Sequence, residues 1–106
     1  MSSASSIALS GLTAASTRLD AHAQNVANLQ SEGYAPVAVT QEALPQGGTV
    51  ATVSREELAS DAALAGTVDL AKELVGQLTA RRAYEANLAT LRAADEAERS
   101  VLDVLG

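Results

Sequence analysis

The residues whose side chains could do chemistry are few in this sequence, and they are not spaced as a catalytic or metal site. His22 is the only histidine, and cysteine is absent. Neither a His/Cys metal cluster nor a thiolate nucleophile can therefore be assembled. A lone histidine on a helix face more often packs or forms a hydrogen bond than acts as a base or ligand, and we expect this of His22.

Three further patterns also lack the context that chemistry would need. Arginines accompany an acidic cluster near the C-terminus, which is typical of a solvated, ion-paired helix face. The cluster consists of Asp95, Glu96 and Glu98, with Arg92 and Arg99 nearby. Gly47-Gly48 lacks the lysine of a phosphate loop, and Ser10-Gly11 lacks the setting of a nucleophile elbow. We expect a protein that is not an enzyme and that uses no cofactor and no metal.

The composition indicates a single domain with a thin core. The 106 residues include 23 Ala and 14 Leu but no Trp, no Phe and only two Tyr. Alanine allows helices to approach closely but buries little apolar area. The net charge is −6 without a basic patch, so we expect no nucleic-acid partner. Because no run of 18 apolar residues occurs, we also expect no direct membrane insertion. The N-terminus lacks the pattern of a cleaved signal peptide.

The longest predicted element is a helix from Val68 to Leu105, roughly 57 Å long at 1.5 Å per residue. Thr67 is its predicted N-cap. Leucines recur along it at helical spacing, namely Leu70, Leu74, Leu78, Leu88, Leu91, Leu102 and Leu105. Arg81, Asp95 and Glu98 interrupt this stripe. They either lie at its edge, paired or snorkelling, or meet charges of another subunit. A helix of this length needs a partner along most of its length.

A second helix is predicted from Ile7 to Leu29. Two rows spaced by seven give it a heptad pattern, Leu12, Leu19 and Val26 with Ala8, Ala15, His22 and Leu29. It contains few charges, which is typical of a helix covered on more than one side. Gly33 is predicted to end it.

The middle segment, residues 34–66, contains helix breakers and β-branched residues. Pro36 and Pro45 exclude a continuous helix, and the valines favour extended chain. The segment is either an irregular linker or a short hairpin turning at residues 46–48. The sequence S-R-E-E at 54–57 has the pattern of a capping box. It favours either a short helix from Arg55 to Ala65 that ends at Gly66, or a helix that runs on into the long C-terminal helix with a break at Gly66.

These elements predict one domain, residues 1–106. It would comprise an N-terminal helix (1–33), a linker with or without a hairpin (34–66) and a long C-terminal helix (67–106). The expected fold class is all-α, with the two long helices paired as an antiparallel coiled-coil hairpin around a short irregular or extended middle segment.

Two stretches together resemble the ends of bacterial flagellar rod and hook proteins. Residues 24–28 read Q-N-V-A-N and residues 31–34 read S-E-G-Y, similar to an N-[IV]-A-N element followed by a T-x-G-[YF] turn. Residues 82–87 read R-A-Y-E-A-N, similar to the Q-R-A-Y-E-A-N element near the C-terminus of that family. Ser31 and Arg81 depart from the usual Thr and Gln. The short middle segment is most similar to a proximal-rod protein.

The resemblance implies a structural subunit of the flagellar basal-body rod that assembles into a helical tube around an export channel. Its partners would be other rod or axial subunits and the flagellar type III export apparatus, and export would proceed without a cleaved signal peptide. The alternative is a small helical export chaperone or adaptor that binds one partner protein.

The candidate site residues are those expected to pack the helices or the subunits. Tyr84 is expected to pack within the helix pair, whereas Asn87, Asn25 and Asn28 are expected between subunits. The full set is Leu12, Leu19, Asn25, Val26, Asn28, Gly33, Tyr34, Leu74, Leu78, Arg82, Tyr84, Asn87, Leu88 and Leu91.

Overall fold

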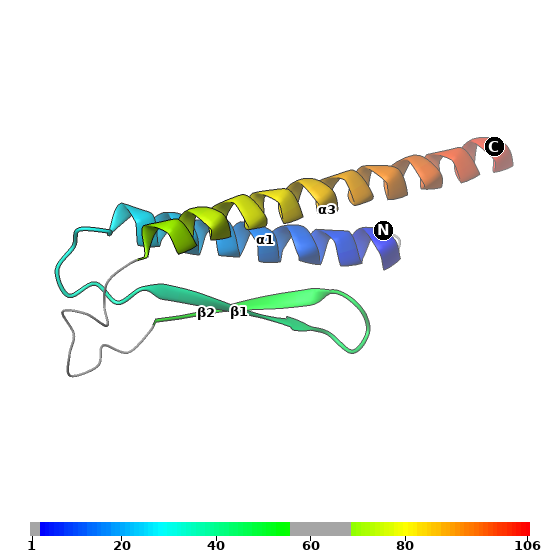
Figure 1. Cartoon of the computed structure of the whole chain (residues 1–106). Helices are drawn as coiled ribbons and strands as arrows, with labels where there is room; N and C mark the ends of the chain where they lie inside the picture. The colour runs from blue at the N-terminus through cyan, green and yellow to red at the C-terminus, as the bar shows by residue number, and fades with distance from the viewer. Residues whose placement is uncertain (1–2, 56–68) are drawn as a thin grey trace.

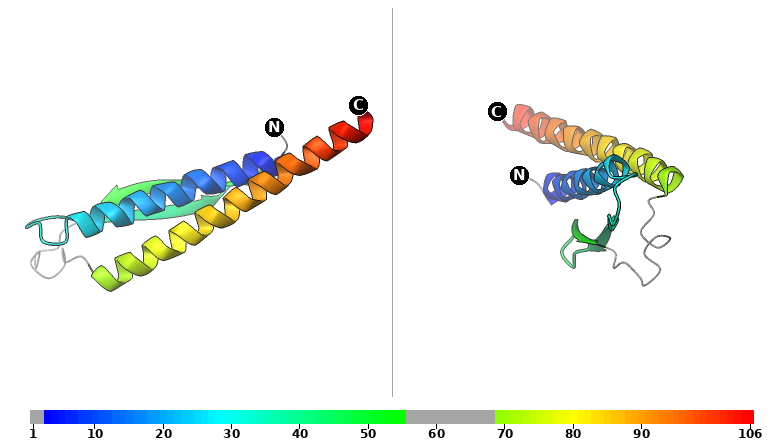
Figure 2. Two further views of the ribbon diagram at one scale, coloured as in Figure 1. Left: turned by 90° about the horizontal axis from the view of Figure 1, so that it is seen from above. Right: turned by 90° about the vertical axis from the view of Figure 1, so that its left-hand side faces the viewer.

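The chain forms two long helices and a β-hairpin in a computed structural model that describes residues 3–55 and 69–106. The elements are α1 (Ser3–Ala27), β1 (Val37–Ala43), β2 (Thr49–Arg55) and α3 (Leu70–Leu105) (Figure 1). α1 and α3 lie side by side and run in opposite directions, and the hairpin lies along α1 (Figure 2). Within the described ranges, α3 and the hairpin both contact α1 but not each other. α1 is therefore the middle layer of three.

The expectation of an all-α fold is wrong, because residues 37–55 form a two-stranded antiparallel sheet. The β-branched residues of the two strands favour extended chain. Gly47 and Gly48 turn it with φ of 96° and 90°, a region that costs most L-residues energy. Pairing runs from Val37 opposite Arg55 to Ala43 opposite Thr49. Of the two alternatives for the middle segment, the chain adopts the hairpin.

α1 buries two adjacent faces, which explains its low charge. One face holds the predicted heptad residues and contacts α3 through Gly11 and His22. The other lines grooves shared with the strands, through Ala14, Ala21 and their neighbours. The all-α expectation gave α1 only one partner, whereas the hairpin provides a second.

Side-chain hydrogen bonds hold both ends of the hairpin to α1. Near the turn, the backbone N–H of Thr49 donates to Oγ of Ser10 at 3.1 Å. At the other end, Asn25 hydrogen-bonds the backbone of Val37. The hairpin is thereby held along most of the length of α1.

α3 begins one residue after an aspartate cap. The side chain of Asp69 accepts a hydrogen bond from the backbone N–H of Lys72, as an N-cap residue does. The predicted cap Thr67, and the predicted short helix from Arg55 to Ala65 beyond its first residue, lie outside the described residues. α1 ends at Ala27, before the stop predicted at Gly33, where the backbone enters a turn with φ of 70°.

α3 is longer than α1, with 36 residues against 25. Its C-terminal end extends past the N-terminal end of α1 (Figures 1 and 2). The molecule is correspondingly elongated, with extents of 66 × 25 × 14 Å.

Candidate functional site

The face of α3 that covers α1 is built from small residues. The positions of α3 that are not fully exposed recur at steps of three and four, and Ala80 among them has no exposed surface. Ala8 and Ala15 are buried on the facing side of α1. Small side chains allow two helix backbones to approach closely. The contact is therefore an alanine-rich seam rather than a leucine zipper.

Several of the predicted packing leucines flank this seam. Leu74 and Leu78 are each 48% exposed, whereas Leu88 and Leu91 are partly buried. On α1, Leu12 is buried, and Leu19 and Val26 are partly buried. The sequence predicts an apolar stripe of leucines on α3. In the structure, α3 contacts α1 through glycine and alanine residues that lie beside this stripe.

His22 and Glu73 form a polar contact across the seam. Nδ1 of His22 lies 2.6 Å from Oε2 of Glu73, whose side chain is only 7% exposed. The imidazole ring lies against Gly76, where an added Cβ would come within 2.4 Å of Cε1. The expectation that His22 forms a hydrogen bond agrees with this geometry. The sequence did not identify Glu73 or Gly76 as its neighbours.

Asn87 forms the corresponding contact near the other end of α1. Its side chain covers Gly11, where an added Cβ would meet Oδ1 at 2.4 Å. Its Nδ2 donates to the backbone carbonyl of Ala83 within α3 at 2.9 Å. Asn87 thus lies between the helices of one chain rather than on an outer face. Tyr84, expected in the seam, is 39% exposed, and Arg82 is exposed.

Asn25 joins α1 to the first strand. Its Nδ2 donates to the carbonyl of Val37, while its Oδ1 accepts from the N–H of Val37 and from the hydroxyl of Tyr34, all at 2.8 Å. The side chain is 1% exposed. The asparagine expected between subunits therefore satisfies buried backbone groups of its own chain.

The neighbouring motif residues shape the turn that follows α1. Nδ2 of Asn28 donates to the carbonyl of Gln24, and Oδ1 of Asn28 accepts from the hydroxyl of Ser31. Gly33 supplies the positive φ of this turn, and the guanidinium of Arg55 lies 5.5 Å from the centre of the Tyr34 ring. The N-V-A-N and S-E-G-Y motifs together form the junction between α1 and the hairpin.

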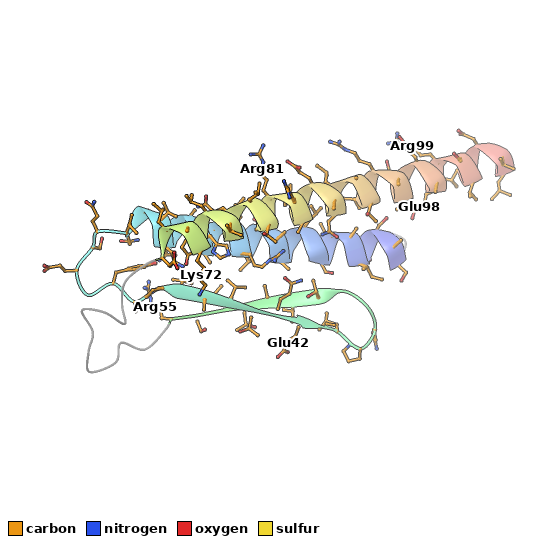
Figure 3. The ribbon with its side chains drawn as sticks, in the orientation of Figure 1. Glu42, Arg55, Lys72, Arg81, Glu98 and Arg99 are labelled. Carbon is orange, nitrogen blue, oxygen red and sulfur yellow. The ribbon has the colours of Figure 1, made fainter. Side chains whose placement is uncertain are left out.

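The charged residues that interrupt the leucine stripe of α3 differ in how exposed they are. Arg81 pairs with Glu85 and Arg99 with Asp95 at exposed i,i+4 positions. Arg81 and Arg99 project from the side of α3 away from α1 (Figure 3). Arg81 and Asp95 are therefore solvated edge positions, whereas Glu98 is partly buried.

Among the described residues, the most exposed large apolar side chains lie at the C-terminal end of α3. Here α3 continues beyond the first turn of α1. Leu102 is 66% exposed and Leu105 79% exposed, and Val101 and Val104 are exposed beside them. A shallow groove connects this end to α1 and is lined by Ala4, Ala94, Ala97, Glu98, Val101 and Leu102. An exposed apolar patch of this kind is typical of an interaction surface.

The described residues contain no cluster of three His, Cys, Asp or Glu side chains that could hold a metal ion. In the same ranges, no helix is long and apolar enough to cross a membrane. The side chains of α1, the hairpin and α3 build packing contacts and an uncovered apolar end.

A comparison with known protein families finds a match for the C-terminal segment of the chain. Residues 66–104 match the family described as flagellar basal body rod FlgEFG protein C-terminal. The match covers nearly all of α3, including the R-A-Y-E-A-N motif, while no curated protein matches the chain. The family is structural rather than enzymatic, and its members belong to the flagellar basal body. Residues 66–104 are thus similar to the C-terminal segment of flagellar basal-body rod proteins.

Proposed function

We propose that the chain is an axial subunit of the flagellar rod that assembles with other rod subunits into a helical tube. The tube would enclose the export channel and transmit torque. The observation that supports this most is the uncovered apolar end of α3, which lies within and just beyond the family match. Exposed leucines and valines on a solvated helix gain stability only when another surface covers them.

The elongated shape supports the same proposal. Two long antiparallel helices present a large side surface relative to the volume they enclose. The leucines that flank the seam, Leu74 and Leu78, add apolar area along this surface. Neighbouring subunits would cover both the flank and the end of α3. The chain would reach the periplasmic rod through the flagellar type III export apparatus.

The test is to determine where the protein resides in the cell. Basal bodies purified from a strain carrying a tagged copy are analysed by mass spectrometry, and a deletion strain is scored for swimming and for complete rods by electron microscopy. We expect the protein in basal bodies at a fixed ratio to other rod subunits, and no complete rods in the deletion strain. Recovery only in the cytoplasm, bound to one export substrate, would instead favour the chaperone or adaptor function.

A further inference from the structure

Each long helix contains a single glycine, and each glycine receives a polar side chain of the other helix. Gly11 is the only glycine within α1, and Gly76 is the only one within α3. Asn87 lies on Gly11, and His22 lies on Gly76. His22 follows Gly11 by eleven positions, and Asn87 follows Gly76 by eleven positions. Both contacts therefore form in the same alignment of the helices.

The rest of the seam does not distinguish one alignment from another. Ala8 and Ala15 of α1 and Ala80 of α3 are buried there, and alanine recurs along both helices at helical spacing. Sliding α3 past α1 by seven residues would bring Ala80, Ala83 and Ala94 to the places of Glu73, Gly76 and Asn87, and would bring Asn87 to the place of Ala80. A polar residue in an apolar helix seam is a known means of fixing one register.

We propose that the His22–Gly76 and Asn87–Gly11 contacts are a two-point lock that sets the register of α1 and α3. A slip of one heptad, about 10.5 Å, would place Ala83 where Gly76 lies and Ala94 where Asn87 lies. The Cβ of Ala83 would then collide with the His22 ring, as an added Cβ at Gly76 does at 2.4 Å.

The same slip would break the hydrogen bond within the lock. Glu73 would move away from Nδ1 of His22, and Ala80 would take its place. The imidazole would lose its partner, and Asn87 would leave the space above Gly11. At His22 the shifted alignment is therefore disfavoured for two separate reasons, the steric collision with Ala83 and the loss of the hydrogen bond with Glu73.

The register also determines how far α3 extends beyond α1. A slip that brings Ala83 to His22 would draw the C-terminal end back by about 10.5 Å and place Val101, Leu102 and Leu105 beside the first turns of α1. The lock thus keeps this apolar end uncovered. The proposal concerns the fold of one chain and holds whether or not the chain is a rod subunit.

Spin-label distances can test the proposal, because the chain contains no cysteine of its own. Labels are attached to cysteines at Ala23 and Ala93, which are exposed on α1 and α3. Their separation in dilute protein is measured by pulsed electron resonance in the unaltered lock and in a variant whose lock is moved by one heptad. The moved lock keeps the amino-acid composition and consists of Glu73→Ala, Gly76→Ala, Asn87→Ala, Ala80→Glu, Ala83→Gly and Ala94→Asn.

We expect one narrow distance for the unaltered lock and one that is shorter by up to about 10 Å for the moved lock. If the moved lock is helical by circular dichroism but keeps the original distance, the proposal is wrong. A second variant decides the question if the moved lock does not fold. It replaces every lock residue by alanine: Gly11→Ala, His22→Ala, Glu73→Ala, Gly76→Ala and Asn87→Ala.

Alanine favours the helices themselves, so this second variant retains its helical content. Without the lock, we expect the distance distribution to broaden or to split into populations about 10 Å apart. A single narrow distribution at the original distance would overturn the proposal, because the register would then be set elsewhere in the chain.

Discussion

At the scale of single residues, Asn25 connects the sequence motif most directly to the fold. Its amide group hydrogen-bonds both backbone groups of Val37 and the hydroxyl of Tyr34. Only a side chain with a donor and an acceptor on one planar group can make this set of contacts. The motif could be recognised in the sequence, but the bonding partner, twelve residues away, could not, because it depends on how the hairpin folds back.

We predict that Asn25→Ala destabilises the chain by about 3 kcal/mol, because it leaves the buried N–H and carbonyl of Val37 without partners. Urea unfolding followed by circular dichroism measures the change. The matched control is Asn28→Ala, whose side-chain bonds are exposed and local, and which should cost less than about 1 kcal/mol. Equal losses for the two variants would contradict the structural role assigned to Asn25.

A second prediction concerns His22, for which the sequence offered no partner. His22→Ala removes the contact of a carboxylate that is almost fully buried. We expect a loss of about 1–3 kcal/mol in the free energy of unfolding at pH 7, and less when Glu73→Ala is also present. A double-mutant cycle measures the coupling between the two side chains. Additive losses would mean that the contact contributes nothing to stability.

At the scale of the elements, the sequence predicted the two long helices because their periodicity is local. It did not predict which side of α3 faces α1. Leucines were assumed to mark the contact, yet Ala80 and Gly76 lie there and Leu74 and Leu78 flank it. An alanine-rich helix has apolar residues on several faces, so hydrophobicity alone does not select one. The presence of one glycine in each helix was the signal that could have identified the seam.

The hairpin turn gives a prediction at this scale. Gly48→Ala should destabilise the hairpin by about 2–3 kcal/mol, because a φ of 90° disfavours a side chain and its Cβ would lie 2.8 Å from Oγ of Ser10. Gly33→Ala is the control, since its φ is also positive but nothing lies within 4 Å of the added Cβ. It should cost only about 1–2 kcal/mol. Amide exchange of the strands distinguishes the two, and faster exchange in Gly33→Ala would contradict the proposed contact with Ser10.

At the scale of the whole molecule, the chain buries little large apolar surface. Within the described ranges, the buried hydrophobic residues are alanines apart from Leu12 and Val37. Burial of this extent offsets little of the entropy lost on ordering two long helices. We predict that the isolated chain is marginally stable and that the last turns of α3 exchange their amide protons quickly. Slow exchange from Val101 to Leu105 in a verified monomer would contradict this.

The last prediction separates folding from assembly. Leu102 and Leu105 lie at the uncovered end of α3, so Leu102→Asp and Leu105→Asp should change the unfolding free energy by less than about 0.5 kcal/mol.

If neighbouring subunits cover this end, each substitution would bury a charge in the assembled rod at a cost of several kcal/mol. We therefore expect normal export but loss from purified basal bodies, with swimming abolished. Leu12→Asp is the contrasting variant, because Leu12 is buried within the chain and its replacement should unfold the subunit itself. Incorporation of Leu102→Asp at the normal level would show that the end of α3 faces water in the rod and that the subunits meet along another surface.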